Sequence, residues 1–253
     1  MYDLPAIAAD GTTLARCVDQ AQPYAPLYVK FKLTWRCNLR CEMCRVWEQD
    51  TSNELTTAEL VRLADELAAL GCRKVHLTGG EVLLRPDLPD LISVFSARDM
   101  RVNLTTNGTL LTRERAQCLV ESGLHSVSVS LDSPRRKVHD RMRGRGNWKR
   151  TLKGLRALRR ARKKSKAKLR IRVNTLISRT NYDSLGNLAA FVQAHGVDRL
   201  TLIPVDDPLT GRLLLNQRRL RDYNAHIGPQ IAQDGIAAGL FDDPNKAFPF
   251  GTD

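Results

Sequence analysis

Three cysteines stand close together near the start of the chain, at positions 37, 41 and 44. Cysteine thiolates are soft ligands that suit iron–sulphur clusters, copper(I) and zinc. A closed structural zinc site needs four ligands; no obvious fourth lies nearby, although His76 or Cys72 could complete such a site. A [4Fe–4S] cluster held by Cys37, Cys41 and Cys44 would instead leave one iron open for a small molecule. Packing as small buried side chains is the third alternative.

A second motif, Thr78-Gly79-Gly80-Glu81, follows about 35 residues later, after a helix-like segment and an apolar, strand-like run. Glycines let a backbone approach a ligand closely, and Glu81 offers a carboxylate for an ammonium group. Capping of the next helix is the alternative role of Glu81. The three cysteines at this spacing, with Gly-Gly-Glu at the end of the next strand, resemble the radical S-adenosylmethionine (SAM) family.

The resemblance implies that the cysteines hold a [4Fe–4S] cluster and that the open iron binds the amino and carboxylate groups of SAM. It also implies reductive cleavage of SAM to methionine and a 5′-deoxyadenosyl radical, which takes a hydrogen atom from a substrate. The cofactor supplies that chemistry, while the protein positions the reacting groups and excludes water from them. No residue is therefore expected to act as a conventional catalytic base. A reductant such as flavodoxin or ferredoxin is the implied partner.

Strand-like and helix-like segments alternate along most of the chain, which indicates parallel strands joined by crossover helices. Six such units predict an α/β fold, a partial (β/α)6 barrel of the TIM type, which is also the core fold of the family that the chain resembles. The predicted strands are 28–34, 74–78, 102–106, 126–131, 169–177 and 199–205, and the predicted helices are 57–70, 87–98, 112–122, 148–164 and 184–195.

Three parts of the chain follow from this pattern. Residues 1–27 form a lead-in with little periodicity, residues 28–206 the core barrel, and residues 207–253 an extension with an amphipathic helix at about 216–231. No cysteine follows Cys118, so clusters beyond the barrel are not expected. We expect either a small enzyme or a fragment that lacks a C-terminal domain.

Polar residues gather where the predicted strands end, which is where parallel βα barrels place their active sites. Hydroxyl, amide and carboxyl groups there suit a ribose and a methionine head, although each has an alternative role in capping a turn. By the resemblance, Arg172 reaches the SAM carboxylate, Arg143 is its rival, and backbone near Ile203 and Pro204 flanks the adenine. The other predicted SAM contacts are Gly79, Gly80, Glu81, Thr106, Asn107, Ser130, Asp132 and Asn174.

The net charge of +13 comes from one segment, residues 135–172, which hold 19 Lys and Arg against one acid, Asp140. The helix predicted there has an apolar stripe and a basic opposite face, which indicates an outer helix with a solvated surface. An anionic partner such as RNA, phospholipid or an acidic peptide is the alternative. Few aromatic residues interrupt the basic ones, so nucleic-acid binding is not favoured.

The composition, with 42% hydrophobic and 26% charged residues, is typical of a globular protein. No apolar stretch is long enough to cross a membrane, and the N-terminus has no basic region typical of a signal peptide. Six cysteines without a secretion signal favour a reducing compartment, the cytoplasm.

The sequence therefore predicts a radical SAM enzyme of unknown substrate. A peptide or protein is the preferred substrate, and cofactor or small-molecule biosynthesis is the alternative within the same chemistry. A hypothesis of another class is a zinc-stabilised nucleic-acid-binding protein, built on the cysteine loop and the basic helix. Metal content separates the two, because one requires iron with sulphide and the other requires zinc.

Overall fold

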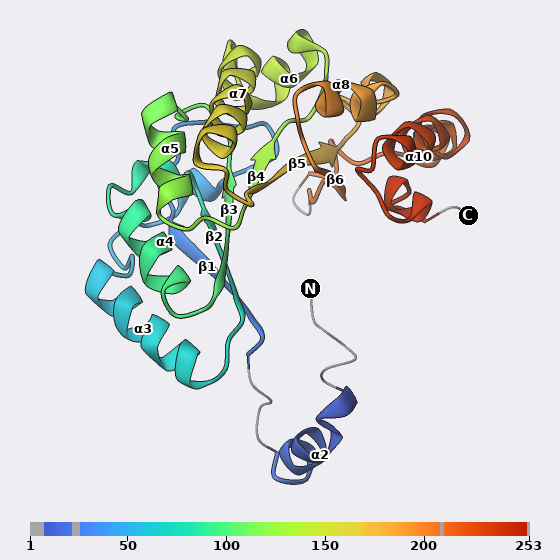
Figure 1. Cartoon of the computed structure of the whole chain (residues 1–253). Coiled ribbons are helices and arrows are strands. Elements are labelled where there is room, and N and C mark those ends of the chain that lie inside the picture. The colour runs from blue at the N-terminus through green and yellow to red at the C-terminus, as the bar shows by residue number, and fades with distance from the viewer. Residues whose placement is uncertain (1–7, 22–25, 208–209, 252–253) are drawn as a thin grey trace.

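A computed structural model of the chain describes residues 8–21, 26–207 and 210–251. Within these residues, six strands form one parallel sheet in which each strand pairs with the next along the chain. The curved sheet is an open, partial barrel (Figure 1), so the predicted α/β architecture is confirmed. The strands are β1 (Tyr28–Thr34), β2 (Lys74–Gly79), β3 (Arg101–Thr106), β4 (Ser126–Ser130), β5 (Arg170–Ile177) and β6 (Arg199–Pro204).

Helices cover the outer face of this sheet (Figure 1). Thr56 caps the first of them in a capping box with Glu59, and the Thr112 side chain accepts a hydrogen bond from the Arg115 N–H at the start of another. The helices are α3 (Thr57–Ala69), α4 (Leu88–Ser96), α5 (Arg113–Glu121), α6 (Arg136–Arg143), α7 (Asn147–Ser165) and α8 (Leu188–Ala194), with short 3-10 turns η1 (Val46–Glu48), η2 (Val82–Leu84) and η3 (Tyr182–Ser184).

The two faces of the sheet differ sharply in burial. Outward side chains such as Val75, Leu77 and Val127 are fully buried in one core with the helices. Most of the alternate, inward positions are polar, and many remain partly or fully exposed, as at His76 and Ser128. Because successive side chains of a strand point to opposite faces, the barrel has a largely polar inner face and the core lies between sheet and helices.

Three elements differ from the sequence-based expectation. α6 was not predicted, because its eight residues include only two apolar side chains, Val138 and Met142. The helix expected over 184–195 begins only at Leu188, after the turn η3. Within the lead-in, α2 (Gly11–Asp19) is a helix without buried residues that stands apart from the barrel (Figure 1). Residues 1–7 and 22–25 of the lead-in lie outside the described residues.

The C-terminal extension contains two helices where one was expected. α9 (Gln217–Asp222) runs through a π-helical turn, η4 (Tyr223–Ile227), into α10 (Gly228–Ala237), and η5 (Pro244–Ala247) follows. Side chains of this extension, Tyr223 and Ile231 among them, belong to the same buried core as the barrel. Of the described helices, none combines the length and the apolar character that crossing a membrane requires.

Candidate active site

Cys37, Cys41 and Cys44 lie on an irregular loop, residues 35–45, that follows the C-terminal end of β1. The loop is tied to other elements at several points. The Glu42 N–H donates to the Met142 carbonyl, 2.9 Å away at the end of α6. The Asn38 amide joins the loop to the end of β3, because its Oδ1 accepts from Asn107 Nδ2 at 2.9 Å. These tethers fix the thiols relative to the barrel rim.

The Gly-Gly-Glu segment is the support on which this loop sits. The Gly80 N–H donates to the Thr34 carbonyl at 2.6 Å, and the Glu81 N–H donates to the Arg36 carbonyl at 2.8 Å. A Cβ at Gly79 would lie 2.3 Å from the Thr34 oxygen, and one at Gly80 would lie 2.1 Å from the Arg36 oxygen. Both glycines are therefore required by the close approach of protein backbone, whereas the sequence suggested the approach of a ligand.

The Glu81 side chain is turned into the protein. It is fully buried, and one carboxylate oxygen accepts from the Thr106 hydroxyl at 2.7 Å and from the Leu83 N–H at 3.1 Å. The other oxygen accepts from the Asn107 N–H at 2.8 Å. Burial raises the pKa of Glu81, and these donors oppose the rise. In this structure Glu81 thus caps η2 and anchors β3, and its contact with SAM stays a prediction.

Thr106 and Asn107 are likewise committed to the protein. Both are buried; the Thr106 hydroxyl bonds Glu81, and the Asn107 amide bonds Asn38 and Thr109. In this structure they hold the cysteine loop against the end of β3. Their contact with SAM stays a prediction.

Asp132 and Arg143 form a buried ion pair beside the thiols. Arg143 Nε lies 2.5 Å from one Asp132 oxygen, and Nη2 lies 3.2 Å from the other. Burial opposes the charge of Arg143, but Asp132 and the adjacent Cys41 and Cys44 outweigh it and raise the pKa of the guanidinium. The Asp132 carboxylate accepts hydrogen bonds from Arg143 and from the Leu176 N–H, and its contact with SAM stays a prediction.

The thiols themselves are partly buried and close enough to influence one another. Burial raises the pKa of Cys41 to about 11, and Arg143 works against this rise. Burial also raises the pKa of Cys37. Because thiols bind metals as thiolates, loading of this site must release protons and must depend on pH.

Arg172 does not join this group. It lies on the inner face of β5, where its closest cationic neighbours are Arg170 and Arg199, and it pairs with Arg199 in the sheet register. The structure therefore places Arg143, the rival candidate, beside the cysteines, and a contact of either arginine with SAM stays a prediction. Ser130 and Asn174 are paired partners at the upper end of β4 and β5, and their partly exposed side chains face the cavity.

The zinc alternative finds no support in the positions of its proposed ligands. His76 uses both ring nitrogens inside the barrel, on the Tyr28 hydroxyl at 2.9 Å and the Thr105 hydroxyl at 2.7 Å. Cys72 is buried against the carbonyl of Lys74. In the described parts of the chain, no three His, Cys, Asp or Glu side chains converge closely enough for a single metal ion. Three thiols on one loop fit the wider [4Fe–4S] cluster.

Comparison with known proteins agrees with this geometry. The profile of the radical SAM superfamily matches residues 31–192, well over half of the chain. The chain belongs to the radical SAM superfamily. The predicted family and its two cofactors, a [4Fe–4S] cluster and SAM, are thereby confirmed, and the superfamily consists of enzymes.

Two curated relatives of this radical SAM chain act in different reactions. It is 37% identical to an AdoMet-dependent heme synthase of Methanosarcina barkeri, over 65% of the chain and 46% of that protein. It is 33% identical to a GTP 3′,8-cyclase of Chlorobaculum tepidum, over 81% of the chain and 62% of that protein. The chain thus spans about half the length of the curated relatives that it matches.

Among solved structures, the radical SAM chain resembles SuiB of Streptococcus suis. The structure of SuiB bound to S-adenosylmethionine aligns with a TM-score of 0.72 and 18% identity, over 92% of the chain and 54% of SuiB. SuiB bound to its precursor peptide SuiA aligns with a TM-score of 0.71. At this identity the likeness concerns the fold, and it supports the partial barrel.

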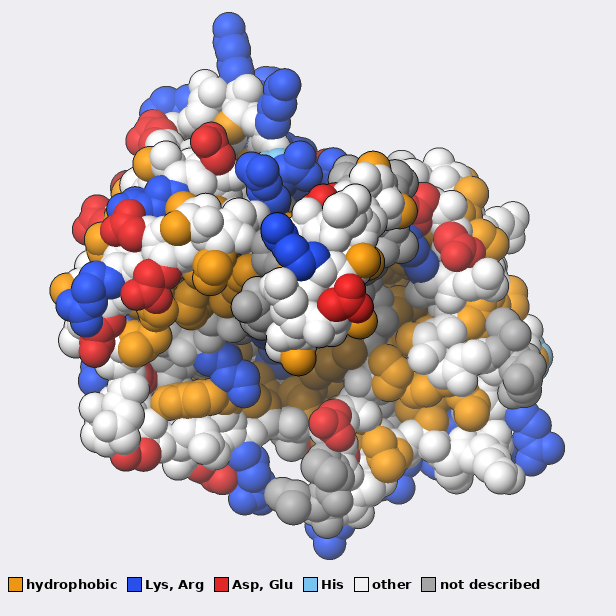
Figure 2. Space-filling view, turned by 90° about the horizontal axis from the view of Figure 1, so that it is seen from below, with side chains coloured by type: hydrophobic (Ala, Val, Ile, Leu, Met, Phe, Trp, Pro, Cys, Tyr) orange, Lys and Arg blue, Asp and Glu red, His pale blue; other side chains and the backbone are white. Residues whose placement is uncertain are grey.

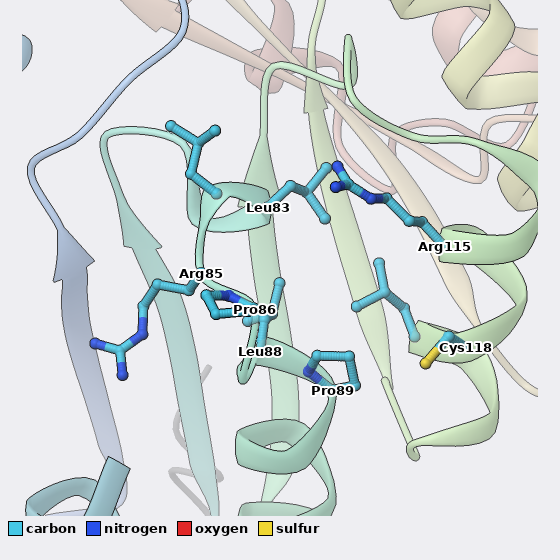
Figure 3. A pocket seen from close by; sticks show the side chains of 9 residues that line it. Leu83, Arg85, Pro86, Leu88, Pro89, Arg115 and Cys118 are labelled. Carbon is cyan, nitrogen blue, oxygen red and sulfur yellow. The ribbon is translucent and has the colours of Figure 1, made fainter. Parts of the chain in front are cut away.

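A pocket of about 250 Å³ lies outside the barrel of this radical SAM domain (Figure 3). Leu83, Pro86, Leu88 and Pro89 face Arg115 and Cys118 across it. Cys37, Cys41 and Cys44 do not line it, so it is not the cofactor site.

Sequence reasoning missed three contributors to the site. Asn38 joins the loop to β3, the Met142 carbonyl receives Glu42, and His139 accepts the Asp132 N–H at its Nδ1. Met142 and His139 belong to α6, which was not predicted. The run His139-Asp140-Arg141-Met142-Arg143-Gly144 was noticed only as the source of a rival arginine, although Gly144 at its end signals a helix stop.

Proposed function

We propose that the chain is a radical SAM enzyme that cleaves SAM reductively and uses the product to abstract a hydrogen atom from a substrate. When bound, the [4Fe–4S] cluster supplies the electron for that cleavage. The observation that carries the proposal is the loop of three partly buried thiols, Cys37, Cys41 and Cys44, beside the buried cation Arg143. The family match supports the same conclusion.

The residues around the loop have separate tasks in this proposal. The cysteines hold the cluster, and the Gly79-Gly80 backbone and Asn107 keep the loop in place. Arg143, oriented by Asp132, offers its remaining N–H donors to an anionic group such as the SAM carboxylate. Ser130 and Asn174 present polar groups on the cavity side, where a ribose or a methionine head would bind.

The proposal extends to the class of substrate and to the electron donor. SuiB, solved with a precursor peptide, supports the preferred substrate, a peptide or protein. The relatives named heme synthase and GTP cyclase support the alternative, a cofactor or small molecule. A flavodoxin or ferredoxin in the cytoplasm would supply the electron, and the exposed basic face of α7 suits an acidic carrier of this kind.

Anaerobic reconstitution tests the proposal. The chain is loaded with iron and sulphide, reduced with dithionite and given SAM, and 5′-deoxyadenosine is measured together with bound iron and acid-labile sulphide. We expect a cluster and product in the parent chain, and loss of both in Cys41→Ala.

Cys118→Ala is the matched control, because Cys118 is an exposed thiol on α5, one of the helices on the outer face of the sheet. It should retain cluster and product. Zinc in place of iron, or a cluster that never yields 5′-deoxyadenosine, would contradict the proposal.

A further inference from the structure

The six strands of the barrel carry an unusual charge pattern. They contain seven Lys and Arg residues and no Asp or Glu. All seven occupy inward positions, alternating with the buried outward side chains. We name this set the basic belt: Lys30, Lys32, Lys74, Arg101, Arg170, Arg172 and Arg199.

The belt lies toward the end of the barrel at which the strands begin. Figure 2 looks at this end and shows a central hollow with hydrophobic side chains in its depth and Lys and Arg side chains at several places around it. Lys74 and Arg101 are direct partners in the sheet register, as are Arg172 and Arg199. Side chains also approach each other across the inner face: Arg172 of β5 lowers the pKa of Lys74 of β2, although two strands separate them.

The charges of the belt are only partly used by the fold: Arg199 donates to the Gly239 carbonyl at 2.8 Å, and the ammonium groups of Lys74 and Lys32 lie over the rings of Tyr28 and Trp35. None of the ion pairs within the described parts of the chain involves a member of the belt. Burial lowers the pKa of Lys74, and Arg172 and Arg101 lower it further. Burial and the neighbouring arginines also lower the pKa of Arg172, whose Nε is buried and finds no hydrogen-bond partner among the described residues. Like charges at this spacing repel and destabilise the folded chain.

A repulsive cationic cavity of this kind is pre-organised for negative charge. We propose that the basic belt binds a small polyanionic substrate, one that carries several carboxylate or phosphate groups. This inference rests on the proposed radical SAM activity, and it favours a small molecule over a peptide. Arg172 lies two residues below Asn174, or about 7 Å along the strand, and Lys74 lies about 16 Å below Gly79. The anionic groups would be held below, while the reacting part reaches the rim that carries the cysteines.

The exposed face of α7 is the rival site for an anion, because Arg156, Arg159 and Arg160 lie on the outside of the barrel. The face is convex and fully hydrated, so its charges are screened by solvent. In the belt, Lys74, Arg172 and Arg199 are half-buried, and charge–charge interactions are stronger there than in open solvent. The two sites therefore make different predictions for the same probes.

Calorimetric titration of the anaerobic, cluster-loaded chain tests the inference. The probes are pyrophosphate and citrate, each added without SAM at fixed ionic strength. We expect at least one probe to bind, and binding to weaken about tenfold in Lys74→Gln and in Arg172→Gln, as loss of a charged hydrogen bond predicts. The outer variant Arg156→Gln should bind like the parent. Preference for pyrophosphate identifies a phosphate-bearing substrate, and preference for citrate identifies a polycarboxylate.

Two results would overturn the inference: binding of neither probe, or equal weakening in the belt variants and in Arg156→Gln. Thermal unfolding excludes a merely structural effect, because removal of a repelling charge should leave the belt variants at least as stable as the parent. The titration requires no SAM cleavage. A chain that binds the probe but forms no 5′-deoxyadenosine would refute the proposed activity alone, and the reverse result would refute only the polyanion site.

Discussion

Arg143 is a buried cation between the carboxylate of Asp132 and the thiols of Cys41 and Cys44. Removing one partner of a buried ion pair leaves the other charge uncompensated, which typically costs about 3–5 kcal/mol. We therefore expect Arg143→Gln to lower the free energy of unfolding by this amount. SAM binding, measured by equilibrium dialysis on the cluster-loaded variant, should weaken about tenfold to a hundredfold.

The double variant Arg143→Gln, Asp132→Asn separates the two roles of this arginine. Both charges are then absent, so most of the lost stability should return, whereas SAM binding should remain weak. Full recovery of SAM binding in the double variant would show that Arg143 serves only to neutralise Asp132.

His139 gives a pH dependence with a definite sign. It is fully buried, its Nδ1 accepts the Asp132 N–H, and burial lowers its pKa from 6.5 to about 4. Between these values the unfolded chain binds a proton that the folded chain does not. Stability is therefore fully present above pH 6.5 and declines as the pH falls toward 4, by about 3 kcal/mol for this residue.

Urea unfolding of the metal-free chain between pH 7 and about 4 measures this decline. In His139→Asn, the side-chain oxygen of the new residue can accept the same N–H. The loss of unfolding free energy at low pH should therefore be smaller in this variant, by about 3 kcal/mol. His76, whose pKa burial also lowers to about 4, remains in both chains and cancels in the difference. Identical pH profiles for the two chains would refute the assignment.

At the scale of elements, the crossing of the cysteine loop over the end of β2 decides the geometry of the site. A Cβ at Gly80 would meet the Arg36 carbonyl oxygen at 2.1 Å, so Gly80→Ala must push the loop away. We expect a loss of about 1–3 kcal/mol and a lower iron content after reconstitution.

Gly186→Ala is the matched substitution, because a Cβ there meets nothing within 4 Å. It should change stability by no more than about 1 kcal/mol and should keep full iron content. If both variants load iron equally, the support given to the loop by Gly80 is not what positions the cysteines.

The order of elements could be predicted because it depends on local patterns. Every predicted strand is found to within one residue at each end, since apolar alternation and the glycines that end helices are written in neighbouring residues. α6 was not predicted because it is short and mostly charged, and its helical state depends on packing of Met142 and His139. The turn between α9 and α10 depends in the same way on tertiary contacts of Tyr223.

The site could be predicted in its components and not in its connections. Sequence spacing placed the cysteines and the Gly-Gly-Glu segment at one rim, but it could not tell that Glu81 turns inward to Thr106. Nor could it choose between Arg143 and Arg172, because that choice depends on which arginine the fold brings to Asp132. Side-chain direction is a property of three-dimensional packing, so motif position alone leaves it open.

For the molecule as a whole, the structure separates its positive charge into two places. The basic face of α7 points outward to solvent, whereas the basic belt points into the barrel. Charges on an exposed helix face are well hydrated and add little to stability. The like charges of the belt repel one another, and the scaffold that holds them is stabilised by the apolar core between sheet and helices.

That core also joins the C-terminal extension to the barrel. Tyr223 is fully buried, its hydroxyl donates to the Ala247 carbonyl at 2.7 Å, and its ring meets Phe250 edge-on at 5.8 Å. Ile231 and Phe241 pack in the same core as Leu188 and Val192 of α8. We therefore expect barrel and extension to unfold as one cooperative unit.

Tyr223→Ala tests this cooperativity. Truncation of a buried aromatic side chain costs about 3–5 kcal/mol, and the whole loss should appear as a shift of a single transition seen alike by circular dichroism and by tryptophan fluorescence. Tyr223→Phe keeps the ring and removes only the hydroxyl, so it should cost about 1 kcal/mol. Because Trp35, Trp47 and Trp148 all lie outside the extension, a fluorescence transition that stays in place while the circular dichroism shifts would show that the extension unfolds separately and that the barrel is stable without it.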